Sequence, residues 1–297
     1  MSALGVTSTS LAACSSAGEA TGAALTDAAS IDVDAGPLLL RNVFPDGLGG
    51  GPSIVADTGA QRAIFALQRD SRYLVGEDLP DSLDAVLTDA EGVDRTVTLP
   101  VRAEQIPLHY LSLVFEPSGS GLYTLSAELQ GESLSTQFVV SPIDDVPLVH
   151  PGQPMPALDS PTTSNAQGIT PICTRDPACR FHELSIADAL DADKPFIVMV
   201  STPAFCSTGI CGPTLEILIS EAATQPDLNF VHVEVYSDPS QLGAVPQQEL
   251  VAPTLAELGM TFEPSLIAVG EDGIVRARLD ASMDRHDISA ALASAVV

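Results

Sequence analysis

A proline-rich stretch near the middle of the chain limits how the polypeptide can fold. Between residues 141 and 171 the chain carries seven prolines, which are Pro142, Pro147, Pro151, Pro154, Pro156, Pro161 and Pro171. Proline lacks a backbone N–H and fixes φ, so it blocks both a helix interior and a central strand. A chain of 297 residues has room for two domains. We therefore predict a linker over residues 143–170, with the domain boundary between Pro142 and Met155.

The first half of the chain has the pattern of short strands. Apolar and polar residues alternate in 61–68 and 83–88, 96–103 is strand-like, and 135–140 is a further candidate strand. Segments 110–115 and 122–129 flank the turn residues 116–121, which is a hairpin signal. About seven short strands with frequent turns are typical of an antiparallel β-sandwich of the immunoglobulin type. We predict such a sandwich over residues 36–142, although no cysteine is present there to form the inter-sheet disulfide of antibody domains.

The second half changes to alternating strands and helices. Residues 196–200 form a continuous apolar run, which is typical of a buried parallel strand. Periodicity and capping signals predict further strands over 229–236, 265–269 and 274–279, and helices over 213–224, 246–258 and 284–296. The order β-α-β-α-β-β-α favours an α/β domain over residues 171–297.

The strong negative charge excludes two classes of partner. Twelve Lys and Arg stand against 39 Asp and Glu, which gives a net charge of −27. Binding to phosphate backbones or to anionic lipid depends on clustered Lys and Arg. We therefore expect no nucleic-acid partner and no basic docking onto membranes. The longest run of bulky apolar residues is 196–200, far short of the roughly 20 that a spanning helix needs, so no transmembrane helix is expected in the mature chain.

The N-terminus carries a candidate lipidation signal. An uncharged stretch of small residues ends in Leu11-Ala12-Ala13-Cys14 and resembles a bacterial lipobox, in which the cysteine is lipidated and becomes the first mature residue. Residues 15–34 are typical of a flexible tether. The resemblance implies that 1–35 is a signal remnant and tether, and that the protein is an extracytoplasmic lipoprotein of the cell envelope. A signal peptide needs a basic n-region, and no Lys or Arg precedes Arg41. The alternatives are therefore a true start upstream or a disordered N-terminus with an unmodified cysteine.

Four further cysteines form two close pairs, Cys173 with Cys179 and Cys206 with Cys211. In an exported chain an even set indicates disulfides or redox chemistry. The second pair falls where the strand 196–200 passes into the following helix, whose N-terminal amides stabilise a thiolate, the nucleophile of disulfide exchange. Residues five apart in one regular helix are about 8–9 Å apart, beyond the roughly 7 Å limit for a disulfide. We therefore expect Cys206 in the loop before the helix, where Gly209 permits a bend.

Together these features resemble the thioredoxin superfamily over about residues 155–297. The resemblance rests on a strand, Phe205-Cys206, a second cysteine, helix, strand, helix, and then Glu263-Pro264 before a hairpin. It implies that Cys206 attacks, that Cys211 resolves the mixed disulfide, and that Pro264 is a cis-proline facing the cysteines. Phe205 and Glu263 would belong to the substrate groove. The layout resembles exported thioredoxin-domain lipoproteins with an N-terminal β-sandwich, whose partners are the thiols and disulfides of exported proteins.

The sequence departs from this family in two respects. The cysteine spacing is C-x-x-x-x-C rather than C-x-x-C, and the position six residues before Cys206 is Val200, where the family has a buried acid. His232 and Glu234 alternate on a predicted strand, so their side chains point the same way. Either is a candidate proton relay, and the alternative is an ordinary polar pair.

For the first cysteine pair we predict a structural disulfide. Cys173 and Cys179 close a loop of five residues that contains a proline. One alternative is a redox partner that exchanges electrons with the second pair. Another is a metal site with His182 and Glu183. Because no C-x-x-C pair is doubled as in zinc ribbons, neither a metal site nor a cofactor is predicted.

Three functions compete at this point. The favoured one is a membrane-anchored, extracytoplasmic thiol–disulfide oxidoreductase acting through Cys206 and Cys211. The second is a non-enzymatic envelope binding or scaffold lipoprotein in which both pairs are structural disulfides. The third is a copper chaperone, which would need His232 or His286 beside a cysteine pair, where C-x-x-x-C would be the expected spacing.

Overall fold

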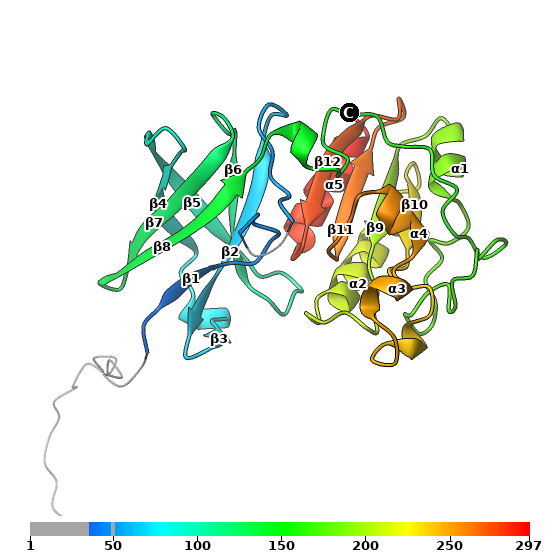
Figure 1. Cartoon of the computed structure of the whole chain (residues 1–297), viewed down its shortest axis with the longest axis horizontal. Coiled ribbons are helices and arrows are strands. Elements are labelled where there is room, and N and C mark those ends of the chain that lie inside the picture. Colours follow the sequence, from blue (N-terminus) through cyan, green and yellow to red (C-terminus); the bar gives the residue numbers. More distant parts are fainter. Residues whose placement is uncertain (1–35, 49–50) are drawn as a thin grey trace, which may run out of the picture. The chain divides into compact units, whose positions relative to one another are not determined.

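The computed structural model describes residues 36–48 and 51–297 (Figure 1). Residues 36–297 form one compact unit that contains two β-sheets. Cys14 and the predicted tether 1–35 lie outside the described residues. Within the described part of the chain, no helix combines the length and the apolar character that crossing a bilayer requires.

The first sheet is antiparallel throughout. Its strands are β1 (Leu39–Asn42), β2 (Gln61–Arg69), β3 (Arg72–Tyr73), β4 (Ser82–Thr88), β5 (Asp94–Arg102), β6 (Tyr110–Phe115), β7 (Gly121–Leu129) and β8 (Glu132–Val140). Their order is β1-β2-β6-β5-β4-β7-β8, with β3 added to β2. Strand β5 changes partner along its length, since residues 94–100 pair with β4 and residues 101–102 pair with β6. This change of partner lets the sheet fold back on itself.

The folded sheet encloses one apolar core. Alternate residues of β4 and β7 are buried, as expected for strands with one face toward the core. Five aromatic rings pack together inside this core, and the centroids of neighbouring rings lie 5.7–5.9 Å apart. The rings belong to Phe44, Phe65, Phe115, Tyr123 and Phe138.

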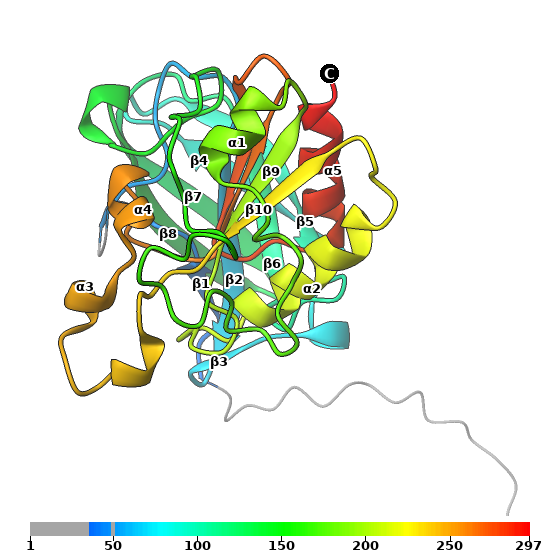
Figure 2. The same cartoon turned by 90° about the vertical axis from the view of Figure 1, so that its right-hand side faces the viewer.

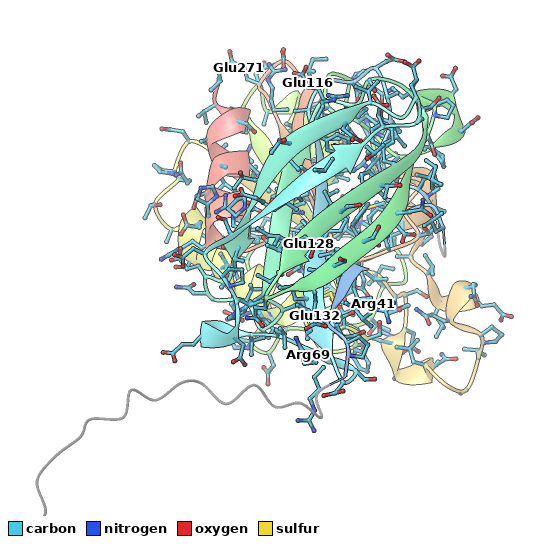
Figure 3. The ribbon with its side chains drawn as sticks, turned by 90° about the vertical axis from the view of Figure 1, so that its left-hand side faces the viewer. Arg41, Arg69, Glu116, Glu128, Glu132 and Glu271 are labelled. Carbon is cyan, nitrogen blue, oxygen red and sulfur yellow. A yellow bond between two sulfur atoms is a disulfide. The ribbon has the colours of Figure 1, made fainter. Side chains whose placement is uncertain are left out.

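Side chains join β8, at one end of this sheet, to β2 and to the residue before β1, near its other end. The ion pair between Arg69 of β2 and Glu132 of β8 has a length of 2.6 Å (Figure 3). Glu132 also accepts the backbone N–H of Leu38 at 2.9 Å. The sheet is therefore nearly closed.

The second sheet has four strands in the order β10-β9-β11-β12. The strands are β9 (Phe196–Val200), β10 (Asn229–Val233), β11 (Ser265–Val269) and β12 (Val275–Asp280). Strands β9 and β10 are parallel, whereas β11 is antiparallel to both β9 and β12. The helices are α1 (Ile186–Asp191), α2 (Cys211–Ala222), α3 (Gln247–Leu250), α4 (Pro253–Glu257) and α5 (Arg285–Ala295), with 3₁₀ turns η1 (Gly76–Asp78), η2 (Ile143–Asp145) and η3 (Pro239–Gln241).

Helices pack on both faces of the second sheet (Figure 2). Val198 and Val200 of β9 join a core cluster that includes α1 and α4. Ile197 and Met199 join a second cluster with α2 and α5. All five residues of β9 are buried, which explains why this strand is continuously apolar rather than alternating.

The proline-rich segment 143–170 packs into the first of these clusters. It contributes the buried side chains of Val146, Leu148, Val149, Met155 and Ile169. The backbone N–H groups of residues 152 and 155 donate to carbonyls of residues 275 and 273, which lie at the start of β12 and just before it. The segment thus forms one short 3₁₀ turn and neither an α-helix nor a β-strand, but its prolines do not exclude burial.

The helix predicted over 246–258 is divided in two. Val251 and Ala252 are extended, with ψ of 130° and 138°. A residue before proline disfavours the helical region, and Pro253 follows Ala252. Helix α3 therefore ends at Leu250 and α4 begins at Pro253. Helix α1 was not predicted, and a capping box between Ser185 and Asp188 starts it.

Candidate functional site

The cysteine pair Cys206 and Cys211 is a disulfide, with 5.9 Å between the Cα atoms. Cys206 lies in the loop after β9, and Cys211 is the first residue of α2. Gly209 has a φ of +70°, a conformation that glycine adopts freely, and it turns the loop between the two cysteines. The bend that the five-residue spacing requires is therefore present.

The two sulfurs differ in their surroundings. Cys211 is fully buried, whereas Cys206 is half-buried beside Phe205, which is 43% exposed. The backbone N–H of Cys211, at the start of α2, donates to Cys206 Sγ at 3.4 Å. Cys206 is thus the accessible sulfur, and it faces an amide that stabilises a thiolate.

Cys206 packs against an apolar cluster that includes residues of the first sheet. The cluster consists of Ile64 from β2, Tyr110 from β6, Ile106 and Ile210. Residues far apart in the sequence therefore form one wall of the site.

A partly buried acid contacts the inner cysteine. Glu263 Oε2 lies 3.5 Å from Cys211 Sγ and accepts the backbone N–H of Thr202 at 2.8 Å. Burial, reinforced by the charge of Glu234, raises the pKa of Glu263 to about 7, against the effect of the Thr202 hydrogen bond. The Glu263–Pro264 peptide bond is cis. Position 200 lacks an acid, but Glu263 brings one to the same pair from the residues before β11.

Glu234, just after β10, holds the loop segment that precedes the cysteines. It accepts the backbone N–H of Thr174 at 2.7 Å and the Thr174 hydroxyl at 3.2 Å. Thr174 Oγ1 in turn accepts the N–H of Ala204 at 3.3 Å. Burial raises the pKa of Glu234. Nothing in the sequence marks Thr174 or Thr202 as parts of this network, because each is a lone threonine in a loop.

His232 turns away from the second cysteine pair. Its Nε2 lies 3.0 Å from the carbonyl oxygen and 2.9 Å from the hydroxyl of Ser201. Its Nδ1 faces the first pair, at 3.7 Å from Cys173 Sγ and 3.4 Å from Cys179 Sγ. Both candidate relay residues therefore contact the stretch that leads to Cys206, His232 directly at Ser201 and Glu234 through Thr174, while the other nitrogen of His232 faces the first cysteine pair.

The structural disulfide predicted for Cys173 and Cys179 is not formed. The two thiols are free and buried, with 3.9 Å between the sulfurs, whereas a disulfide has about 2.05 Å. The two residues face His232 and His182 rather than bonding to each other.

The copper-chaperone alternative needs a histidine beside Cys206 and Cys211. In the described part of the chain, the residue that shares a potential ligand group with this pair is Glu263. His232 belongs to the group of Cys173 and Cys179, and His286 lies with Asp284 and Asp287. The geometry therefore does not favour copper binding at Cys206 and Cys211.

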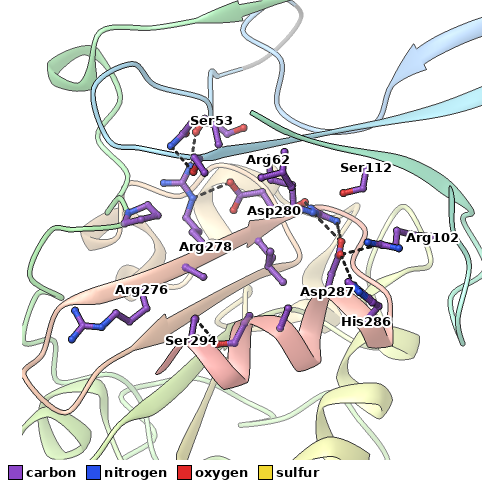
Figure 4. Close-up of a pocket in the computed structure, with 18 of the residues that line it drawn as sticks. Ser53, Arg62, Arg102, Ser112, Arg276, Arg278, Asp280, His286, Asp287 and Ser294 are labelled. Atoms are coloured by element: carbon purple, nitrogen blue, oxygen red, sulfur yellow. Dashed lines mark hydrogen bonds and ion pairs between the residues drawn. The ribbon is translucent and has the colours of Figure 1, made fainter. Parts of the chain in front are cut away.

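A pocket of about 610 Å³ lies elsewhere, between strands of the first sheet and β12 and α5 (Figure 4). Four arginines line it, and each of them pairs with an acid. Arg102 pairs with Asp287, and Arg276 pairs with Asp272. Arg62 pairs with Asp287 at 2.6 Å, and Arg278 pairs with Asp280 at 2.9 Å. Internal ion pairs therefore neutralise these arginines, and the pocket does not present free positive charge to bind an anion.

Comparisons with known proteins find a likeness only among solved structures. No protein-family model matches this chain, and no curated protein matches it. Three chains of solved structures match, among them one titled "Structure of MTB dsbF in its mixed oxidized and reduced forms". That match has 21% sequence identity, covers 33% of this chain and 81% of that chain, and has a TM-score of 0.25. A similarity of this size carries no argument about function.

Proposed function

We propose that this protein is a thiol–disulfide oxidoreductase of the thioredoxin-like type, acting through Cys206 and Cys211. The observation that carries the proposal is the asymmetry of the pair. Cys206 is accessible and accepts a hydrogen bond from the backbone N–H at the start of α2, whereas Cys211 is buried and contacts the carboxylate of Glu263. The order of strands and helices in the second sheet is consistent with a thioredoxin-like domain. The folded first sheet is consistent with an immunoglobulin-type sandwich over residues 36–142.

The reaction is a two-electron exchange with a substrate disulfide. In the reduced protein the Cys206 thiolate attacks one substrate sulfur, which breaks the substrate disulfide, releases one substrate thiolate and forms a mixed disulfide. Cys211 then gives its proton to the Glu263 carboxylate and attacks Cys206 Sγ. This second attack releases the other substrate thiolate and forms the Cys206–Cys211 disulfide. The substrate gains two electrons and the protein loses two, and the reverse sequence oxidises a substrate dithiol.

Trapping of the mixed disulfide tests this proposal. Cys211→Ser should accumulate a covalent complex with substrate, because attack proceeds and resolution does not. Cys206→Ser is the matched control and should form no complex. Both variants are expressed in an oxidising compartment and compared on reducing and non-reducing gels. If Cys211→Ser traps nothing, and the wild-type protein neither reduces nor oxidises a test disulfide, the redox function is wrong. The scaffold function would then replace it.

We also propose that the protein acts outside the cytoplasm as a lipoprotein anchored through Cys14, which agrees with partners that carry disulfides. The proposal rests on the lipobox-like sequence that ends at Cys14. In a bacterial host, Cys14→Ser should move the protein from the membrane fraction to the soluble fraction. A variant that stays in the membrane fraction would contradict the anchor at this position.

A further inference from the structure

We propose that Cys173, Cys179, His182 and His232 form a structural zinc site. The four residues are buried, and their ligand atoms all lie within 4.8 Å of one another. Three of the residues, Cys173, Cys179 and His182, lie in the segment 173–182, whereas His232 comes from β10, about fifty positions further along the chain. This site is separate from the proposed redox function, because neither Cys206 nor Cys211 belongs to it.

The distances between donor atoms match a tetrahedral zinc ion. Zinc binds sulfur at about 2.3 Å and imidazole nitrogen at about 2.0–2.1 Å, so in a tetrahedron two sulfurs lie about 3.8 Å apart, a sulfur and a nitrogen about 3.5 Å, and two nitrogens about 3.3 Å. Here the two sulfurs are 3.9 Å apart. His232 Nδ1 is 3.7 Å and 3.4 Å from the sulfurs of Cys173 and Cys179, and 3.0 Å from His182 Nε2.

One of the imidazoles is already oriented for metal binding. His232 Nε2 lies 3.0 Å from the carbonyl oxygen of Ser201, which can only accept a hydrogen bond. The proton therefore resides on Nε2, and Nδ1 directs a lone pair toward the two sulfurs. A ligand histidine usually donates its other ring N–H to a carboxylate, a backbone carbonyl or a water, and here the backbone carbonyl of Ser201 is in that place.

Charge and ligand type favour zinc over other ions. Two thiolates neutralise a divalent cation, so the completed site has no net charge and can be buried. Two sulfur and two imidazole ligands in a tetrahedral arrangement suit zinc, whereas calcium and magnesium prefer oxygen. Binding would release the protons of both thiols, so zinc affinity should fall as the pH falls.

The site would clamp the segment 173–182 to the second sheet. Thr174, next to Cys173, donates a hydrogen bond to Glu234 and accepts one from the backbone N–H of Ala204. The backbone N–H of His232 donates to the carbonyl of Phe181 at 2.7 Å. Zinc therefore takes the stabilising role that a disulfide between Cys173 and Cys179 would otherwise have.

Metal analysis of the full chain tests the site. Protein purified without chelator should hold about one zinc ion per chain, as a four-ligand structural site requires. Cys179→Ser and His182→Gln should each lose most of this zinc. The matched control Glu183→Gln changes an exposed neighbouring acid and should retain it. Reduced wild-type protein that binds no zinc after dialysis against zinc, or variants that retain full zinc, would overturn the proposal.

A second measurement covers the case in which the ligand variants do not fold. The variant Cys14→Ser/Cys206→Ser/Cys211→Ser leaves Cys173 and Cys179 as its only cysteines. After chelation and addition of cobalt, it should show the visible absorption of tetrahedral Co(II) together with thiolate-to-metal charge transfer. Zinc should abolish both signals, and alkylation in denaturant should then modify both cysteines. Absence of the charge-transfer band, or a Cys173–Cys179 disulfide that persists in zinc-treated reduced protein, would refute the site.

Discussion

At the scale of single residues, Glu263 is the acid that contacts the buried cysteine of the pair, Cys211. It is partly buried between Thr202 and Cys211, and this burial raises its pKa to about 7. An acid with a pKa near the working pH exchanges protons most effectively. The residue is therefore suited to accept the proton of Cys211 during resolution.

Removal of this carboxylate should slow resolution. For Glu263→Gln we expect the second step of disulfide exchange to fall by about 10²-fold or more, which is the range for loss of a general base. In the wild-type protein the rate of this step should rise as the pH rises through about 7, and in the variant that rise should disappear. Stopped-flow kinetics against pH measures both effects. The exposed Glu257→Gln is the control, and an unchanged pH profile in Glu263→Gln would contradict the role.

The same residue links stability to pH. The pKa of Glu263 is higher in the folded protein than its ordinary value of 4.5, so the folded state holds the proton more tightly. The resulting stability is fully present below pH 4.5 and is lost as the pH rises through about 7. Above that pH, Glu263→Gln should raise the free energy of unfolding by about 1–2 kcal/mol, allowing for partial exposure. Urea unfolding at several pH values measures this change, and a destabilised variant would contradict it.

At the scale of elements, the loop between β9 and α2 sets the geometry of the pair. The loop places Cys206 outside the helix, so five residues of separation still allow a Cα–Cα distance of 5.9 Å. Gly209 makes this possible because its positive φ is unfavourable for residues with a Cβ.

Substitution of Gly209 should therefore affect the backbone alone. A Cβ at this position would meet no atom within 4 Å, so no steric clash adds to the conformational cost. We expect Gly209→Ala to lower the free energy of unfolding by about 1–2 kcal/mol. Gly209→Asn should cost less, since asparagine tolerates this region better. Gly119→Ala, a position with equal space and no positive φ, should not destabilise. Equal losses in all three variants would contradict this account.

At the scale of the whole described unit, Asp287 of α5 connects the second sheet to the first. It binds Arg62 of β2 at 2.6 Å, the hydroxyl of Tyr110 of β6 at 2.8 Å and Arg102 of β5 at 3.3 Å. Burial acts to raise the pKa of Asp287, but the charge of Arg62 and the hydrogen bonds of Tyr110 and Arg62 outweigh it, so the pKa is lowered. Tyr110, held by this carboxylate, also packs in the cluster beside Cys206.

Neutralising Asp287 should weaken the whole unit. Asp287→Asn leaves the buried Arg62 without its counter-ion, and breaking such a pair costs about 3–5 kcal/mol. Because the pKa of Asp287 is lowered in the folded state, its contribution is present above its ordinary value of 3.8 and is lost as the pH falls further. Thermal unfolding at neutral and acidic pH measures this, with the exposed Asp227→Asn as control. An Asp287→Asn variant as stable as the wild type at neutral pH would contradict the role of the contact.

Local patterns in the sequence were sufficient for most elements and for the cysteine pair. Strands β6 and β11 begin and end at the predicted residues. The reason is that the apolar pattern of a strand can be recognised within a few residues of sequence. The place of Cys206 outside the helix followed from helix geometry, although α2 begins at Cys211, two residues before the predicted start at 213. The division of α3 from α4 was also encoded locally, by the proline at 253, although periodicity concealed it.

Only the tertiary structure decided which side chains meet. The family resemblance placed Glu263 in the groove beside the cysteines, but its contact with Cys211 depends on the pairing of β11 with β9, which local patterns do not specify. His232 joins Cys173 and Cys179 because the segment 173–182 packs beside β10, so the residue expected to serve the redox pair instead completes a four-residue cluster. Contacts of this kind depend on strand order and on the packing of distant segments. Periodicity and turn chemistry act over only a few residues. They therefore determine the secondary-structure elements but not the contacts between distant residues.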